Sequence, residues 1–238
     1  MNIVIDCGNT YSKMGWFEDG RIVDHRRGLL LGEVVDLIRN NLPDRIMFSS
    51  VSLTAEEFVK NLGVEVPVMN LSPETPLPVR KDYFTPHTLG ADRIAAAVGA
   101  NWLYPGEDII VIDMGTCITY DWIDKNAVFQ GGLISPGVKM RFNAVHTFTK
   151  RLPLLEPQKE PVFVGKSTKE AIESGIMNGV LAEMQGIIDR YRHNSGAMRV
   201  LICGGDASFF ESSLKPPIFA VPELVLIGLN RILTYNVS

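Results

Sequence analysis

The chain contains 238 residues, of which 46% are hydrophobic, and carries a formal net charge of −4. A chain of this size and composition can bury one large core or two modest ones without disulfides. The acidic excess argues against a general affinity for nucleic acid, which requires clustered Lys and Arg. The sequence also shows neither a basic leader nor an apolar stretch long enough to cross a membrane. We therefore expect a globular protein that binds neither nucleic acid nor membranes.

The cysteines indicate the compartment. They are three in number and far apart, and no Cys-x-x-Cys pair is present to hold a metal or support a redox couple: Cys7, Cys117 and Cys203. This usage is typical of free thiols in a reducing environment. We therefore expect a cytoplasmic protein.

The first half of the sequence predicts a three-stranded meander followed by alternating helices and strands. An apolar strand ends at Asp6, and the next two strands are separated by Asp19-Gly20, a strong hairpin signal. Thr54 and Glu57 form a capping-box pattern at a helix start. The elements expected after the first strand are strands at 12–17 and 21–24, a helix at 32–41, a strand at 45–51 and helices at 54–62 and 95–102.

The second half repeats this order. A buried strand ends at Asp113, and a second meander follows, divided at residues 124–126. The elements expected beyond Asp113 are strands at 118–123 and 127–134, helices at about 138–149 and 169–192, a strand at 199–203 and a last helix from residue 222.

The two halves also share a motif. Residues 4–8 read VIDCG and residues 111–115 read VIDMG, about half the chain apart. Repeated motifs with repeated flanking elements indicate duplicated domains. We therefore predict an α/β protein with two ribonuclease H-like (actin-like ATPase) domains, at 1–105 and 106–238. Each domain would have a mixed sheet flanked by helices, with a cleft between the domains.

The turn after each aspartate suits a nucleotide. Gly8 allows the backbone to approach phosphates, Asn9 and Thr10 can donate hydrogen bonds to them, and Asp6 can hold a hydrated Mg²⁺ that bridges their oxygens. Lys13 could add a positive charge over the phosphate tail. A plain hairpin turn would use the same residue types. The repetition of the turn in both halves favours the nucleotide interpretation.

A third glycine signal follows the strand at 199–203. Adenine or ribose could rest on Gly204-Gly205. The alternative is a tight connection between a strand and a helix. Neither the Rossmann glycine spacing nor a Walker A pattern is present, so neither of those nucleotide sites is expected.

Together these residues resemble the type III pantothenate kinases, whose first phosphate loop reads Asp-x-Gly-Asn-Thr-x-x-Lys. The resemblance extends over nearly the whole chain. The matching motifs are Asp6 to Lys13, Ser49-Ser50-Val51, Tyr83-x-x-Pro86, Gly90-Ala91-Asp92-Arg93, Asp113-x-Gly115-Thr116-x-x-Thr119-x-Asp121, Gly131-Gly132-x-Ile134-x-Pro136-Gly137, Leu152-Pro153, Thr168, Gly204-Gly205 and Leu224-Val225-Leu226-x-Gly228-Leu229.

The resemblance implies ATP-dependent phosphorylation of pantothenate to 4'-phosphopantothenate, the first step of coenzyme A biosynthesis. It implies Mg²⁺, a monovalent cation (K⁺ or NH₄⁺) and a homodimer. By resemblance, Asp92 is the base for the substrate hydroxyl, Thr116 touches ATP, and Asp113 helps bind the monovalent cation. The implied substrate pocket consists of Tyr83, Gly90, Ala91, Asp92, Arg93 and Thr168.

Several of these residues have structural alternatives. Asp92 could cap a helix or pair with Arg93, which could itself hold a carboxylate or a phosphate. Tyr83 could be a core aromatic and Thr168 a helix cap. Cys203 stands where relatives often carry Thr, which puts a hydroxyl contact near the nucleotide in doubt. The long helix at 169–192 could be a core helix or could also meet a partner.

Two other functions are compatible with the same fold. One is a sugar kinase. The other is a nucleotide-binding accessory factor in transcriptional regulation, without turnover. Retention of Asp92 and of both phosphate loops disfavours the second.

Overall fold

The computed structural model describes residues 1–8, 11–50, 53–214 and 217–237. The chain divides into two compact units. Unit 1 comprises residues 1–106, 124–130 and 223–238, and unit 2 comprises residues 107–123 and 131–222. The domain boundary predicted from the sequence, between residues 105 and 106, is based on the repeated motif. It stays a prediction.

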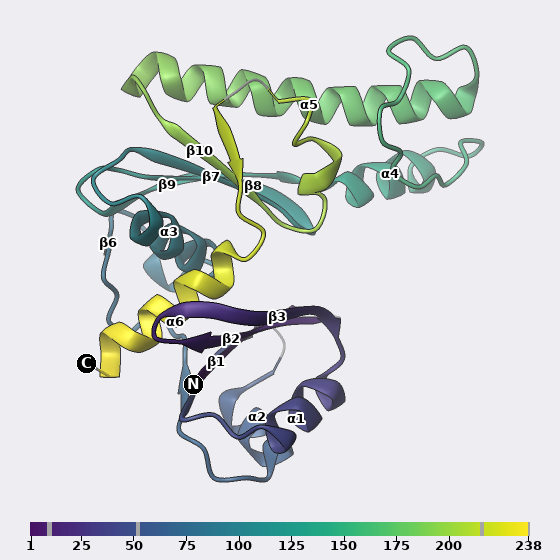
Figure 1. Cartoon of the computed structure of the whole chain (residues 1–238). Coiled ribbons are helices and arrows are strands. Elements are labelled where there is room, and N and C mark those ends of the chain that lie inside the picture. The colour runs from purple at the N-terminus through teal and green to yellow at the C-terminus, as the bar shows by residue number, and fades with distance from the viewer. Residues whose placement is uncertain (9–10, 51–52, 215–216, 238) are drawn as a thin grey trace. The chain divides into compact units, whose positions relative to one another are not determined.

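Unit 1 contains a five-stranded sheet in the order β3-β2-β1-β4-β5 (Figure 1). Its strands are β1 (Asn2–Cys7), β2 (Ser12–Glu18), β3 (Arg21–Leu29), β4 (Arg45–Ser50) and β5 (Val68–Asn70). The predicted hairpin lies between β2 and β3. Asp19 and Gly20 both have positive φ, of 47° and 77°, as a two-residue hairpin turn requires.

Two helices cover one face of this sheet, α1 (Leu31–Asn40) and α2 (Ala55–Leu62). The predicted capping box at α2 is confirmed: Thr54 accepts from the backbone N–H of Glu57, and the Glu57 side chain accepts from the N–H of Thr54. Apolar side chains at helical spacing bury this face against alternate residues of β1, such as Ile3 and Ile5.

Two further helices of unit 1, α3 (Ala91–Leu103) and α6 (Leu224–Val237), pack tightly against each other. Gly228 of α6 lies directly on the Ala95 carbonyl of α3, so no side chain fits there. Leu226 of α6 reaches Gly15 of β2, which places α6 on the sheet face opposite α1 and α2 (Figure 1). The last helix of the chain therefore belongs to unit 1, although the repeat groups it with the second half.

The second sheet has six strands in the order β11-β10-β7-β8-β9-β6. Its strands are β6 (Arg80–Lys81), β7 (Ile109–Met114), β8 (Cys117–Ile123), β9 (Val128–Pro136), β10 (Arg199–Cys203) and β11 (Ile218–Ala220). The strand predicted at 199–203 has the predicted bounds. Short 3₁₀ turns occupy Pro86–Thr88 and Ala207–Phe209.

The duplication expected from the sequence is confirmed in the strand order. Five strands of the second sheet read β9-β8-β7-β10-β11, which matches β3-β2-β1-β4-β5 of the first. In both, the first strand pairs antiparallel with the meander and parallel with the strand on its other side. The α/β class with two mixed sheets flanked by helices is therefore confirmed.

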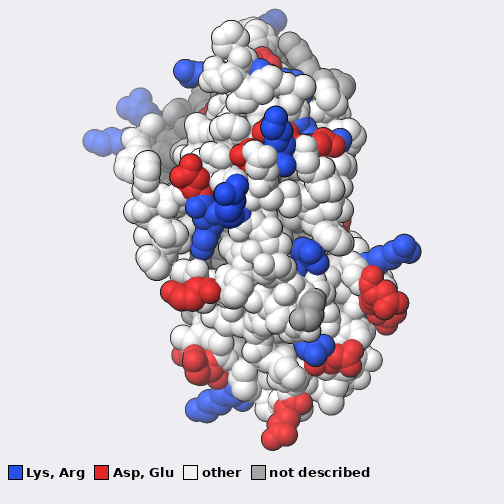
Figure 2. All heavy atoms as spheres, turned by 90° about the vertical axis from the view of Figure 1, so that its left-hand side faces the viewer, with Lys and Arg blue, Asp and Glu red and all other residues white. Residues whose placement is uncertain are grey.

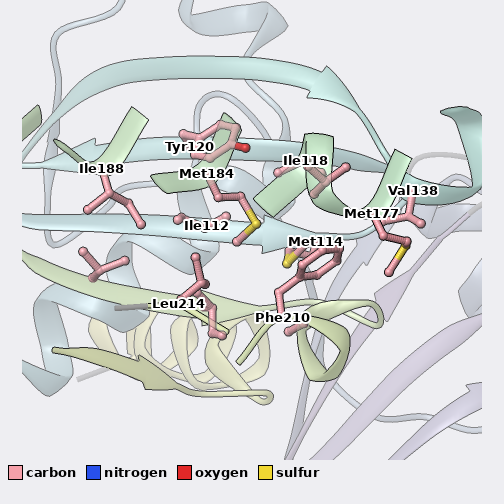
Figure 3. Close-up of a cluster of buried hydrophobic side chains, with 14 of the residues drawn as sticks. Ile112, Met114, Ile118, Tyr120, Val138, Met177, Met184, Ile188, Phe210 and Leu214 are labelled. Carbon is pink, nitrogen blue, oxygen red and sulfur yellow. The ribbon is translucent and has the colours of Figure 1, made fainter. Parts of the chain in front are cut away.

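The core of unit 2 lies between its sheet and the helices α4 (Val138–Thr147) and α5 (Thr168–Ser195). Figure 3 shows Ile112 and Met114 of β7 among the side chains of this core, with Tyr120 of β8 beside Met184 of α5. Alternate residues of β7 thus face α5, and Val111 and Asp113 point to the other face of the strand.

On the face of the molecule drawn in Figure 2, basic and acidic side chains are interspersed. This mixture agrees with the small net charge of the sequence. Among the helices of the described residues, none is long and apolar enough to cross a membrane.

Candidate functional site

Asp6 is the fifth residue of β1 and lies between two neighbouring strands. It stands opposite Lys13 of β2 and Ser49 of β4. The Lys13 Nζ lies 3.9 Å from Asp6 Oδ2. Because Ile3 and Ile5 face the core under α1 and α2, strand alternation directs Asp6 to the opposite face.

The turn after Asp6 is closed by its backbone. The Gly8 N–H donates to the Tyr11 carbonyl at 3.1 Å. Asn9 and Thr10, the two expected phosphate donors of this turn, lie outside the described residues. Burial raises the pKa of the neighbouring Cys7 thiol, and its hydrogen bond with Ser12 opposes this. Cys7 is therefore a packed, protonated thiol and not a nucleophile.

Asp113 occupies the same position in unit 2 as Asp6 does in unit 1. It is the fifth residue of β7 and stands opposite Thr119 of β8 and Cys203 of β10. The Cys203 thiol donates to Asp113 Oδ2 at 3.4 Å. This contact was not predicted, because nothing in the local sequence connects residues 90 positions apart.

The Gly204 turn lies against Asp113. Gly204 has a φ of 92°, and a Cβ there would lie 2.6 Å from Asp113 Oδ1 and 2.5 Å from the Met114 backbone. Only glycine fits this position. The next residues continue this packing, since the Asp206 N–H donates to the Met114 carbonyl at 3.0 Å. The structure therefore brings Gly204-Gly205 to the end of β7, beside Asp113.

The loop that carries Thr116 is the second part of this site. The Gly115 N–H donates to the Cys117 carbonyl at 3.0 Å, and the Thr116 side chain is exposed. Gly137, at the start of α4, lies on the carbonyls of Gly115 and Thr116, where no side chain fits. In unit 2 the structure thus brings together the Thr116 loop, Asp113 and the Gly204 turn.

Asp206 and Lys139 extend this cluster and were not assigned a role from the sequence. Burial raises the pKa of the Asp206 carboxyl, and the positive charge of Lys139 opposes that shift. The signal that could have drawn attention to Asp206 is its place directly after the glycine pair.

Asp92 lies at the start of α3, in unit 1. The cap position of this helix is Gly90, and the Asp92 side chain is exposed. Its Oδ1 accepts from the backbone N–H of Arg93 at 2.8 Å and lies so close to Gly90 that a Cβ there would be 2.6 Å away. The helix N-terminus stabilises its negative charge.

Arg93 is buried between two rings. Its guanidinium carbon lies 6.0 Å from the centre of the Tyr83 ring and 5.9 Å from that of Phe129. Its exposed fraction is 7%. The family resemblance groups Tyr83 with Arg93, and the structure brings them together. Phe129, which completes the cluster, was missed, because no sequence pattern connects it to either residue.

Thr168 is the first residue of α5, in unit 2, and its side chain is exposed. The cap of this helix is Ser167, whose hydroxyl accepts from the Glu170 N–H at 3.2 Å. Thr168 is therefore not occupied in capping.

The carboxylate of Asp6 suits a magnesium ion that keeps most of its water ligands. No group of three or more His, Cys, Asp or Glu side chains gathers as a metal site within the described ranges. Mg²⁺ is usually held by one or two carboxylates, with water and substrate phosphates completing its shell. Asp6, near the end of β1 and 3.9 Å from the Lys13 ammonium, provides a carboxylate of that kind.

Two like-built sheets, each with an aspartate near the end of its first strand and a glycine turn beyond it, define the actin-like and sugar-kinase fold. The structure matches a protein described as a Baf family transcriptional activator from Campylobacter jejuni, with a TM-score of 0.65, 23% identity and 98% of both chains covered. It also matches one described as a 2-dehydro-3-deoxygalactonokinase from Sinorhizobium meliloti, with a TM-score of 0.60, 13% identity and 99% of both chains covered. At these identities the likeness concerns the fold alone.

The sequence comparisons identify the family. Residues 2–190 match the family model for type III pantothenate kinase. The chain is 47% identical over 237 residues to the type III pantothenate kinase of Cytophaga hutchinsonii, with all of both chains covered. The chain belongs to the type III pantothenate kinase family.

Proposed function

We propose that the chain transfers the γ-phosphoryl group of ATP to the primary hydroxyl of pantothenate. The product is 4'-phosphopantothenate, and the reaction is the first step of coenzyme A biosynthesis. Membership of the family, over nearly the whole chain, carries this proposal. The repeated aspartate at the same place in two like-ordered sheets supports it.

Each unit carries residues that we assign to ATP. In unit 1, Gly8, Asn9, Thr10 and Lys13 serve the phosphates. Asp6 holds Mg²⁺, which when bound neutralises charge that develops on the transferred group. In unit 2 the corresponding residues are Thr116, on its exposed loop, and Gly204 and Gly205, beside Asp113. The close approach of backbone at Gly204 supports this role, because a side chain there would fill the turn.

Asp92 orients the pantothenate hydroxyl and accepts its proton. Its exposed carboxylate on the first turn of α3 supports this role. An aspartate is a weak base, but phosphoryl transfer depends mainly on positioning and charge stabilisation. Weak basicity therefore suffices.

The residues proposed for pantothenate are Tyr83, Gly90, Ala91, Asp92 and Arg93 in unit 1, and Thr168 in unit 2. Arg93 is buried against the rings of Tyr83 and Phe129. Its positive charge would attract the carboxylate of pantothenate. The aromatic rings provide an apolar wall, and the exposed Thr168 hydroxyl can bond to a polar substrate group.

Asp113 contributes to a site for a monovalent cation, K⁺ or NH₄⁺. Its neighbours support a weakly bound ion: they include the Cys203 thiol and Gly204. The Asp113 carboxylate supplies the negative charge for this ion.

The enzyme acts as a homodimer in the cytoplasm. Large apolar side chains of unit 2 are exposed in the segment after α4, among them Phe148, Phe163 and Val164. Exposed apolar groups of this kind suit contact with a second copy. The absence of disulfides among the three cysteines, all of which lie in the described residues, fits a reducing compartment.

The test is ADP release measured by a coupled assay, with pantothenate, with hexoses and with neither, each with and without potassium. We expect release only with pantothenate, and faster release with potassium. Release with hexoses alone would identify a sugar kinase instead. Nucleotide binding without any turnover would identify a regulator.

A further inference from the structure

Arg141 links the end of β9 to the first turn of α4, in unit 2. Its Nε donates to the Pro136 carbonyl at 2.9 Å, and its Nη2 donates to the Ser135 hydroxyl at 2.9 Å. The guanidinium therefore holds the two residues that precede Gly137, where the helix begins.

Glu183 of α5 anchors this guanidinium. Arg141 Nη2 donates to Glu183 Oε2 at 2.7 Å, and the Tyr120 hydroxyl donates to Glu183 Oε1 at 2.9 Å. Burial alone would raise the pKa of Glu183, but hydrogen bonds from Arg141, Ser135 and Tyr120 outweigh it and lower the pKa. Glu183 is therefore ionised, and four elements (β8, β9, α4 and α5) meet at one carboxylate.

The Tyr120 side chain, which donates to Glu183, is held in place by the core of unit 2. Tyr120 is fully buried, and Figure 3 shows its ring in the core of unit 2 beside Met184. Burial raises the pKa of its hydroxyl far above the ordinary value, and the charge of Glu183 adds to this. Tyr120 is therefore a neutral donor that fixes Glu183 against the sheet.

This network ends at the Thr116 loop. Gly137 follows Pro136 directly and lies on the carbonyls of Gly115 and Thr116. The contact is too close for any side chain at Gly137, so the position of the 136–137 peptide determines where the loop can lie. Arg141 holds that peptide through the Pro136 carbonyl.

We propose that Arg141 is a positioning residue for the Gly115–Thr116 loop, with Glu183 and Tyr120 as its anchors. Arg141 sets the loop for the ATP phosphates through Pro136 and Gly137. The inference rests on one part of the proposed function, namely that the Gly115–Thr116 loop binds ATP. It predicts that weakening the Arg141 network lowers nucleotide affinity, whatever the phosphoryl acceptor.

A second ion pair of unit 2 provides a matched control. Arg199 donates to Glu107 through Nε at 2.7 Å and Nη2 at 2.9 Å, and its side chain is 20% exposed, as is that of Arg141. Arg199 stands at the start of β10, opposite Ile109, whereas Cys203 at the end of that strand faces Asp113. Its ion pair is thus similar but lies at the far end of the strand from the proposed ATP residues.

The experiment compares Arg141→Lys with Arg199→Lys. Lysine keeps the charge but cannot donate to Pro136, Ser135 and Glu183 together. For each variant, the Kd of MgATP is measured by calorimetry without acceptor, the KM for ATP and kcat are measured with pantothenate, and Tm is recorded. We expect Arg141→Lys to raise the Kd and KM for ATP about tenfold, equivalent to ~1.4 kcal/mol, with kcat changed less than about threefold. Arg199→Lys should lower Tm to a similar degree and leave both ATP constants unchanged.

Tyr120→Phe gives an independent arm if Arg141→Lys does not fold. This change removes only the hydroxyl that fixes Glu183, and we expect it to raise the Kd of MgATP about threefold, a smaller effect because one neutral donor is lost. Equal effects of Arg141→Lys and Arg199→Lys on Kd, or no effect of Arg141→Lys and Tyr120→Phe, would overturn the inference. Wild-type protein that binds MgATP but does not phosphorylate pantothenate would overturn the proposed function alone, because the Kd comparison still tests the loop.

Discussion

The strands β1 and β7 are two copies of one structural device with different surroundings. Each carries its aspartate at the fifth position, between an antiparallel and a parallel neighbour. Asp6 has the Lys13 ammonium 3.9 Å away. Asp113 instead receives a hydrogen bond from the Cys203 thiol and lies against Gly204.

The difference in surroundings suggests different roles for the two copies within the proposed function. A carboxylate beside a lysine can hold a divalent ion while the lysine meets the phosphates. A carboxylate that accepts from a thiol and lies against a glycine turn is proposed to hold a weakly bound ion beside a nucleotide. We therefore assign the phosphates and Mg²⁺ to the β1 turn, and the monovalent cation and nucleoside end to the β7 turn, as parts of the proposed function.

The largest expected effect is that of Asp92→Asn. Asp92 lies on neither β1 nor β7, so this variant gives the loss of turnover against which changes in the two strands are compared. The amide keeps the size of the side chain but cannot accept the hydroxyl proton. We expect kcat to fall by roughly 10²–10⁴-fold, with Tm and the Kd of MgATP nearly unchanged. Loss of folding on this change would instead indicate a structural role at the start of α3.

The next effect is that of Asp6→Asn, which tests the β1 copy. An amide is a poor Mg²⁺ ligand, so we expect turnover to fall about 100-fold and the Mg²⁺ concentration for half-maximal rate to rise. The matched control is Asp24→Asn, an exposed aspartate of β3 that lies 3.8 Å from Arg26. If Asp6→Asn turns over as fast as this control, the assignment of Mg²⁺ binding to Asp6 is wrong.

Gly204→Ala tests the close packing of the β7 copy. A Cβ would meet the Met114 backbone at a φ of 92°, and we expect the free energy of unfolding to fall by roughly 1–3 kcal/mol. The control is Gly205→Ala, where a Cβ has no neighbour within 4 Å. Chemical denaturation of both variants measures the difference, and equal stability would contradict the packing described at Asp113.

Cys203→Ser should have the smallest effect. A hydroxyl can donate to Asp113 as the thiol does, so we expect the potassium dependence of turnover to change less than about threefold. Cys203→Ala removes the donor and should change the potassium requirement more. If Ser and Ala behave alike, the thiol contact does not tune Asp113.

The local elements of this fold were predictable because their signals are local. The Asp19-Gly20 hairpin, the capping box at Thr54 and the strand at 199–203 each depend on neighbours in sequence. The shared strand order followed from the repeated VID motif. The placement of α6 in unit 1 did not, because it depends on the packing of Gly228 against Ala95, far away in the chain.

The candidate site was predictable in part. The aspartates and glycines of the turns were found from the residues, whereas the roles of Asp92 and Thr168 came from the family resemblance. The Cys203 contact with Asp113 and the burial of Arg93 under Phe129 were not foreseen, because such contacts join distant segments. Neither residue type nor spacing encodes them.

The most direct test of the central claim is a titration of MgATP, in potassium-containing buffer, into wild-type protein and into Asp6→Asn and Asp113→Asn. If both aspartate-ended strands serve one nucleotide with its ions, each single change should weaken MgATP binding by roughly tenfold or more. An unchanged Kd in either variant, with the protein folded, would contradict the claim that both copies act on the same ATP.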